Sequence, residues 1–281
     1  MKKGRNLRSV NTDGGVNLQF KLLSAIGIII IVSGHCYHGG MELAYNWFPP
    51  YSYNLALFVF ISGYFYKTDY EENVGKYIWK RTKRLLIPAY LWNIFYGGMV
   101  AFLGLFGFTI GAKPDLYNLF VMPFVDGEAF QYNLGSWFVY PLFLVCIINV
   151  LFRKFLKLIH LDNEFIVLIV YLAIGMIGIN TALENQTAIN GIVKLLVRTM
   201  FFLPCYEFGR FYKAVLEKKD TLNNVAYFAI IFAVQLILLT FCKDLEYTPS
   251  SFTKFNNGFI IPYISSITAI AFWLRVSRLL V

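Results

Sequence analysis

The stretch IIIIVSGHCYHGG, residues 28–40, runs four isoleucines and a valine into His35, with a second histidine, His38, three positions later. An unbroken apolar run of this kind predicts a helix inside a membrane. An imidazole nitrogen that has no partner in hydrocarbon costs several kcal/mol. Two histidines at the end of the most apolar helix therefore need an explanation other than packing.

The composition of the whole chain is that of a membrane protein. Its 281 residues are 58% hydrophobic and 15% charged, and the mean hydropathy is +0.57, which excludes a water-soluble globular protein. Because a helix crosses the bilayer core with about 20 apolar residues, the predicted fold is all-α, a polytopic transmembrane helix bundle that forms one domain over residues 1–281. The eight expected spans lie at about 20–36, 51–66, 85–109, 134–152, 164–180, 191–212, 223–242 and 258–274.

The basic residues gather on one side of this predicted bundle. The formal net charge is +9, and 20 of the 25 Lys and Arg residues fall on the N-terminal arm, on the second, fourth and sixth connections, and at the far end of the chain. The positive-inside rule therefore predicts that these segments, and with them both ends of this chain, face the cytosol. Contact with anionic lipid is enough to account for the basic arm, so no nucleic-acid partner is predicted.

His35 has three interpretations at this point. It lies fourteen residues beyond Lys21, about 21 Å into the membrane at about 1.5 Å per residue. It is a candidate general base, because histidine titrates near neutral pH and ionisable residues inside membranes are often functional. It could instead satisfy a neighbouring helix by a hydrogen bond, or form a metal pair with His38. No clear third ligand lies at this depth, so no metal is predicted, and His38 is expected to have no catalytic role.

The sixth span holds three ionisable residues, Lys194, Arg198 and Glu207. Lys194 and Arg198 share a helix face, whereas Glu207 lies about 13 Å further along the axis than Arg198. They cannot all pair with one another, so each needs a partner from another element. A substrate-lining role for Arg198 and Glu207 is one prediction, and buried pairing or snorkelling to the interfaces is the alternative.

The stretch YIWKRTKRLLIP, residues 77–88, carries four cations in five positions where the third span begins. It could be an ordinary positive-inside anchor. On an α-helix, however, Arg81 and Arg84 are three residues apart and point the same way, which suits diphosphate oxygens. A nucleotide-bearing donor from the cytosol, such as a coenzyme A thioester, is therefore a second interpretation.

Four blocks in the first half of the chain occur in a recognisable order. They are AIGIIIIVSGH (25–35), LALFVFISGYFY (55–66), WKRTKRLLIPAYLW (79–92) and LGSWFVYPLFL (134–144). Together they resemble the acyltransferase-3 family of integral-membrane acyltransferases, which modify polysaccharides, lipopolysaccharide, peptidoglycan and similar envelope molecules. From about residue 150 onward only the hydropathy and the stretch FFLPCYEFGRFYK (201–213) fit.

The resemblance implies an O-acyltransferase of the bacterial cytoplasmic (inner) membrane. It would move an acyl group, usually acetyl from cytosolic acetyl-CoA, to a hydroxyl of an envelope polysaccharide or glycolipid. His35 takes the place of the family's essential histidine, either as general base or as the carrier of the acyl group in an acyl-histidine relay. Acyl-CoA is a donor substrate and no bound cofactor is expected. The candidate site comprises His35 as the catalytic residue, Arg81, Arg84 and Lys80 for acyl-CoA, and Ser62, Tyr64, Trp137, Arg198 and Glu207 lining the substrate, with Tyr64, Trp137 or the Ser62–Gly63 backbone as donors to the developing oxyanion.

Two departures from the family pattern limit these expectations. Many members have an arginine eleven residues before the histidine, where this chain has Ser24. The family usually has about ten spans where eight are predicted here, so a truncated bundle is expected. Two other functions stay open: a transporter or flippase for a lipid-linked glycan, although no repeat symmetry is evident, and a membrane scaffold, which would leave His35, Arg198 and Glu207 unexplained.

Overall fold

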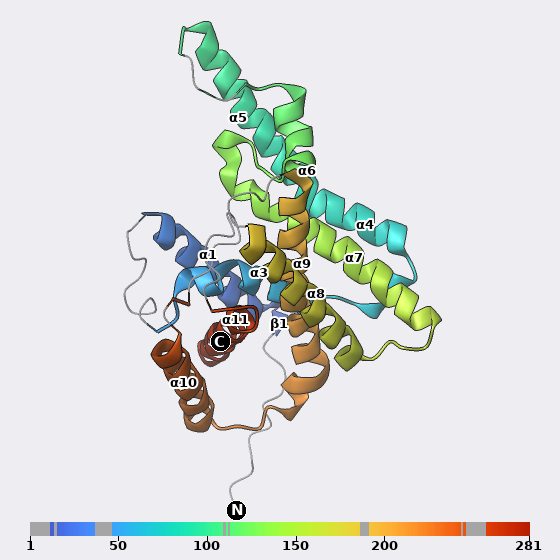
Figure 1. Ribbon diagram of the computed structural model, residues 1–281, viewed down its shortest axis with the longest axis vertical. Helices are drawn as coiled ribbons and strands as arrows, with labels where there is room; N and C mark the ends of the chain where they lie inside the picture. Colours follow the sequence, from blue (N-terminus) through green and yellow to red (C-terminus); the bar gives the residue numbers. More distant parts are fainter. Residues whose placement is uncertain are drawn as a thin grey trace, which may run out of the picture.

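The prediction of an all-α transmembrane bundle is confirmed by a computed structural model (Figure 1). The structure describes residues 12–13, 16–36, 47–108, 111, 113–185, 191–242, 244–245 and 257–281. Besides helix, the regular structure in these ranges is one pair of two-residue strands, in which β1 (Thr12–Asp13) pairs antiparallel with β2 (Val16–Asn17).

Ten α-helices are described. They are α1 (Leu18–Cys36), α3 (Asn54–Tyr64), α4 (Val74–Arg81), α5 (Ile87–Leu105), α6 (Met122–Val125), α7 (Val139–Leu158), α8 (Glu164–Asn185), α9 (Gly191–Phe211), α10 (Asn224–Phe241) and α11 (Ile261–Leu279). Four 3₁₀ segments connect them: η1 (Pro50–Ser52), η2 (Thr68–Glu71), η5 (Gln131–Phe138) and η7 (Glu217–Lys219). Three π turns join or extend helices: η3 (Thr82–Leu86), η4 (Tyr117–Val121) and η6 (Tyr212–Leu216).

Five continuous helical segments are long and apolar enough to cross a membrane. They are Leu18–His35, Val74–Leu105, Gln131–Leu158, Glu164–Asn185 and Asn224–Phe241. The other three expected spans are helices too, but α3 has only 11 residues, α9 carries four charged side chains, and α11 contains Arg275 and Arg278. Helices therefore occupy all eight expected positions, while the number that qualify as spans by length and composition is five.

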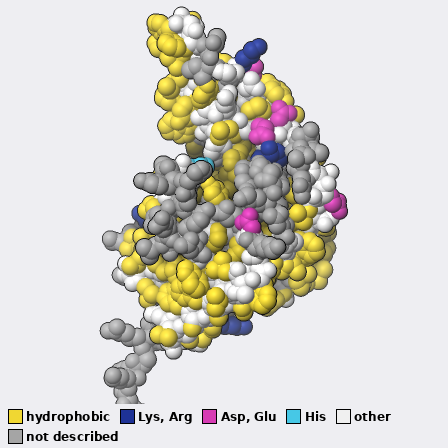
Figure 2. Space-filling model, turned by 60° about the vertical axis from the view of Figure 1, so that its left-hand side comes forward, with side chains coloured by type: hydrophobic (Ala, Val, Ile, Leu, Met, Phe, Trp, Pro, Cys, Tyr) yellow, Lys and Arg dark blue, Asp and Glu magenta, His cyan; other side chains and the backbone are white. Residues whose placement is uncertain are grey.

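The surface of the bundle fits contact with lipid. Figure 2 shows one face on which hydrophobic side chains cover most of the described surface and charged ones are few. Large apolar side chains are exposed along α5, where Leu91 and Phe102 are 60% and 59% exposed. An apolar surface of this extent is expected for a membrane protein and is rare on a soluble monomer.

Helix α9 forms the centre of the bundle, where it packs most extensively against α3, α7 and α8 (Figure 1). Its Phe201, Phe202 and Tyr206 are fully buried. The crossing of α3 and α9 is very close, because two glycines face the partner's backbone. A Cβ on Gly63 would lie 1.8 Å from the Tyr206 carbonyl oxygen, and one on Gly209 would lie 1.9 Å from that of Phe60. Small residues allow helix backbones to approach in this way.

Contacts between helix ends show which residues lie at the same depth along the bundle. The rings of Phe20, near the start of α1, and Tyr64, at the end of α3, stack at 4.0 Å. Arg153, near the end of α7, pairs with Glu207, near the end of α9. We call this end of the bundle the basic side, since it is the predicted cytosolic side. The far end of α1, with His35, is then on the opposite side.

Candidate active site

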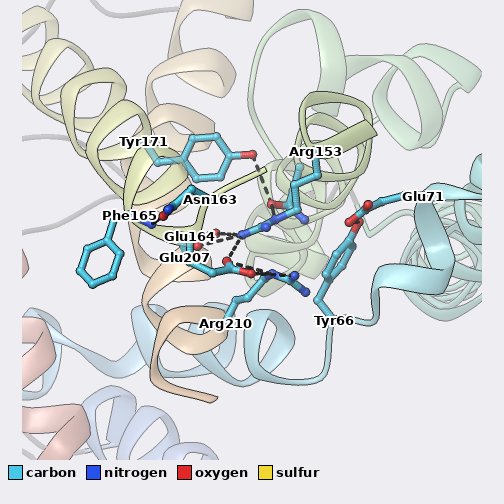
Figure 3. A network of polar contacts seen from close by, with 10 residues as sticks. Tyr66, Glu71, Arg153, Asn163, Glu164, Phe165, Tyr171, Glu207 and Arg210 are labelled. Carbon is cyan, nitrogen blue, oxygen red and sulfur yellow. Dashed lines mark hydrogen bonds and ion pairs between the residues drawn. The ribbon is translucent and has the colours of Figure 1, made fainter. Parts of the chain in front are cut away.

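A buried charged network holds the basic side together (Figure 3). Arg153 Nη2 lies 2.6 Å from Glu207 Oε2 and 2.7 Å from Glu164 Oε2, so one arginine joins α7, α8 and α9. Arg210 Nη2 adds a second cation 2.8 Å from Glu164 Oε1. Two arginines and two glutamates balance in charge, which makes burial of the group tolerable.

Neutral side chains complete this network. Asn149 Oδ1 accepts hydrogen bonds from Arg153 Nε and from the Tyr171 hydroxyl, both at 3.2 Å. The ring of Tyr66 lies 5.0 Å from the Arg210 guanidinium, and its hydroxyl donates to Glu71 Oε1 at 3.2 Å. Tyr66 therefore links the Arg210 end of the network to Glu71 of η2.

Replacing Arg153 by methionine is expected to destabilise the protein strongly. Glu207 has no exposed surface, so the variant would leave a buried carboxylate without its cation, at a cost of about 3–5 kcal/mol. The measurement is thermal unfolding of the detergent-solubilised protein. The double variant Arg153→Met/Glu207→Met is expected to recover much of the loss, because it removes both charges. A single variant as stable as wild type would contradict the assignment of this pair.

The Glu207 carboxylate is thus already paired with a side chain of the protein itself. Both of its carboxylate oxygens accept hydrogen bonds from Arg153 Nη2, at 2.8 and 2.6 Å. The alternative of buried pairing describes this geometry, and a substrate-lining role for Glu207 stays a prediction that requires the pair to open.

The arginine motif is divided between the interior and the surface. Arg81 is half-buried, with its guanidinium 5.0 Å from the Tyr77 ring centroid, whereas Arg84 is exposed. The π turn η3 begins directly after Arg81, and a π turn takes more residues per turn than an α-helix. Residues three apart no longer share a face there, so the structure differs from the expectation that both guanidinium groups point the same way. Their roles in acyl-CoA binding stay predictions.

A pocket of about 320 Å³ opens beside Lys80 on the basic side. It lies between η2 and α4, and its lining residues are Lys67, Asp69, Tyr70, Asn73, Lys76, Tyr77 and Lys80. Three lysines and one aspartate give it a net positive charge. The rings of Tyr70 and Tyr77 stack at 4.6 Å, and Lys80 Nζ donates to the Tyr70 hydroxyl at 3.2 Å. Ammonium groups beside stacked rings suit a ligand that combines phosphates with an aromatic base.

Ser62 and Tyr64 also lie on the basic side, at the end of α3. The Tyr64 hydroxyl donates to Glu217, with its oxygens at 3.0 and 3.1 Å. From the level of Phe20 and Tyr64, His35 is fifteen residues further along α1, about 22 Å at about 1.5 Å per residue. The structure therefore does not bring Ser62 or Tyr64 to His35, and a shared oxyanion site for them is not seen in this arrangement.

Arg198 and Trp137 form a pair toward the opposite side. The Arg198 guanidinium lies 4.5 Å from the Trp137 ring centroid, and Arg198 is 2% exposed. Its Nη1 donates to the carbonyl of Gly127, and the neighbouring Lys194 pairs with Glu128. These contacts fasten the 126–128 turn to α9, where a Cβ on Gly127 would lie 2.8 Å from the Gly191 carbonyl oxygen. Because Arg198 lies nine residues before Glu207 on α9, about 13 Å away from the basic side, the pair belongs to the half of the bundle in which α1 ends.

His35 lies in the last turn of α1 and is exposed. The Tyr51 hydroxyl donates to the Gly34 carbonyl at 3.2 Å, which places η1 next to this turn. Within the described ranges no hydrogen bond or ion pair engages the imidazole, so the expectation that it serves a neighbouring helix gains no support. His38 lies outside the described residues.

A family model described as an acyltransferase domain, Acyl_transf_3, matches residues 17–281. The chain belongs to the acyltransferase-3 family. The match confirms the resemblance and extends it over the second half of the chain, where the sequence blocks alone are weak. It also makes the protein a multi-pass membrane acyltransferase. No curated protein and no solved structure matches the chain.

Several residues of this acyltransferase-3 domain are not predicted as site residues from the sequence. In the sequence, the cations of the network, Arg153 and Arg210, lie in predicted loops, and Glu164 begins a predicted span. Their pairing arises only when α7, α8 and α9 pack together. A signal was present, since Glu207 in a span demands a cation at the same depth and Arg153 stands on the same predicted side. Lys67 and Tyr70 likewise reach the pocket of Lys76 and Lys80 only because η2 folds back on α4.

Proposed function

We propose that the protein transfers an acyl group, acetyl in the simplest case, from cytosolic acyl-CoA to a hydroxyl of an envelope polysaccharide or glycolipid. The protein would lie in a bacterial cytoplasmic membrane with its N-terminus in the cytosol. The observation that carries the donor assignment is the pocket of three lysines and two stacked tyrosines beside Lys80.

The nucleotide part of acyl-CoA fits this pocket chemically. Its phosphates would contact Lys67, Lys76 and Lys80, and its adenine would lie against a tyrosine ring. The half-buried Arg81 stands deeper, next to Tyr77, and its Nε has no acceptor among the described residues. An oxygen of the donor would supply that acceptor. The exposed Arg84 is available to the diphosphate from the surface.

In the proposed reaction, His35 removes the proton of the acceptor hydroxyl as its oxygen attacks the thioester carbonyl carbon. The tetrahedral intermediate collapses, the carbon–sulfur bond breaks, and the imidazolium returns the proton to the leaving thiolate. The products are an ester and free coenzyme A, so atoms and charge balance. Trp137 and Arg198, on the same side as His35, would contact the acceptor.

The length of α1 separates the donor pocket from His35, and this distance limits how the thioester can reach the imidazole. Tyr77 lines the donor pocket, its hydroxyl lies 3.4 Å from that of Tyr206, and Tyr206 packs on Gly63 near the end of α3. The pocket is therefore on the order of 20 Å from His35, measured along the axis of α1. In both routes the extended pantetheine arm must carry the thioester inward to His35. The acyl group then passes to the acceptor hydroxyl either directly, with His35 as the base, or through an acyl-histidine intermediate.

The test of the proposal is incorporation of labelled acetyl from acetyl-CoA into envelope material by inside-out membrane vesicles. For the donor pocket, Lys76→Gln/Lys80→Gln is expected to raise KM for acyl-CoA roughly tenfold with little change in kcat, because about 0.7 kcal/mol is lost at each of the two exposed charge contacts. Lys83→Gln, on the same helical segment but outside the pocket, is the matched control.

Two results would contradict the proposal. Equal KM values for the double variant and the Lys83 control would remove acyl-CoA from this pocket. Active translocation of a lipid-linked glycan by the same vesicles, without any acetyl incorporation, would favour the flippase alternative.

A further inference from the structure

A second pocket, of about 480 Å³, lies on the other face of α9 from the charged network. Its walls come from α3, α8, α9, η6, α10, α11 and the connection before α10, and the apolar lining residues include Phe60, Phe208, Leu216, Leu222, Ile270 and Leu274. Phe208 and Phe211 line it, whereas Glu207 and Arg210, each one position earlier, point into the network. The pocket shares no lining residue with the donor pocket. It is of the size of small-molecule sites, about 300–1,000 Å³.

This pocket is open to its surroundings at the basic side. Phe208 lies in the last turn of α9, and Leu222 lies two residues before α10 begins. Leu216 and Leu222 are 46% and 44% exposed, so the apolar interior is accessible from outside the bundle. At this depth the outside is the boundary between the hydrocarbon core and the headgroups of the predicted cytosolic leaflet.

The polar end of the pocket carries a net positive charge. Asp220 lines it but accepts from Arg275 Nη1 and Arg278 Nη1, both at 2.9 Å. Arg278 Nη2 also donates to the Tyr212 hydroxyl at 2.7 Å. Lys219 and Asp220 are the charged residues that line the pocket, and Arg275 and Arg278 lie behind Asp220. With Glu217, which also acts on Arg278, three cations face two carboxylates, so one positive charge is in excess. The pocket therefore joins an apolar body to a rim that attracts anions.

We infer that this pocket binds one acyl chain of an anionic phospholipid, with the lipid phosphate held at the rim by Lys219 and Arg278. An apolar cavity open to the membrane selects a hydrocarbon chain, and the excess positive charge at headgroup depth selects an anionic headgroup. A neutral lipid would gain the first interaction and not the second. The bound lipid would fill the space between α3, α9 and α11 and so support the wall of the bundle.

The test is titration of the detergent-purified full chain with dioleoyl phosphatidylglycerol or dioleoyl phosphatidylcholine, followed by native mass spectrometry. One phosphatidylglycerol is expected to bind at least tenfold more tightly than phosphatidylcholine. Lys219→Glu should reduce that preference about fivefold or more, since one basic residue near a headgroup contributes about 1 kcal/mol. Lys218→Glu, exposed but outside the pocket lining, should leave the preference unchanged.

A second pair of variants tests the apolar body. Leu216→Asp places a charge in the pocket and should weaken both lipids, whereas Val225→Asp, at an 81% exposed position outside the lining, should not. Unchanged thermal unfolding of each variant confirms that it is folded. Equal affinity for the two lipids, or equal effects of the two members of either pair, would overturn the inference. Because binding is measured without acyl transfer, its failure is separate from a failure of the proposed function.

Discussion

The Gly63→Ala variant is expected to fail to accumulate as folded protein. The added Cβ would lie 1.8 Å from the Tyr206 carbonyl oxygen and 2.8 Å from its carbonyl carbon. These are backbone atoms of the central helix, which cannot move aside as the end of a flexible side chain can. Overpacking a core ordinarily costs about 1–3 kcal/mol, and a clash with backbone belongs at or above the upper end of that range. Gly209→Ala should have a similar effect through Phe60.

Membrane abundance and the elution profile of the solubilised variant measure this outcome. Gly98→Ala is the matched control, because Gly98 also lies within a membrane helix and an added Cβ there meets nothing within 4 Å. It should be as stable as wild type or gain up to about 1 kcal/mol from the better helix propensity of alanine. If Gly63→Ala behaves like Gly98→Ala, the two helices do not cross as closely as described.

The same crossing shows what sequence could and could not supply. Helix positions follow from long apolar runs, which is why a helix occupies every expected span. The glycines of ISGY and EFGR were visible as small residues, but nothing in the sequence says that Gly63 faces Tyr206 and Gly209 faces Phe60. That information arises only when two elements about 140 residues apart pack.

The site residues divide along the same line. The pattern marked Glu207 as a residue that needs a partner, but not Arg153, 54 positions away. The α-helical spacing of Arg81 and Arg84 suggested a common face, and the π turn that separates them has no sequence signal. Local spacing therefore predicts candidates well, whereas the depth and orientation of each candidate depend on packing.

His35→Ala is expected to lower the rate of acyl transfer by about 10²- to 10⁴-fold, the usual contribution of a general base. KM for acyl-CoA should change little, because the donor pocket lies on the basic side while His35 lies at the far end of α1. The measurement is labelled acetyl incorporation by inside-out vesicles at matched membrane levels. His160→Asn is the control, because His160 is an exposed histidine with a positive φ of 56° that asparagine tolerates.

His35→Gln separates the interpretations that the sequence left open. Glutamine keeps a hydrogen-bonding side chain but cannot accept the proton, so it should be as inactive as alanine if His35 is the base and active if it only bonds a neighbouring helix. Quenching wild type after exposure to labelled donor without acceptor distinguishes the two chemical routes. Label that stays on the wild-type protein and is absent from His35→Gln indicates an acyl-histidine relay, whereas an unlabelled but active wild type indicates direct transfer. Wild-type activity in His35→Gln would remove His35 from the chemistry and leave Trp137 and Arg198 as the remaining candidates on that side of the membrane.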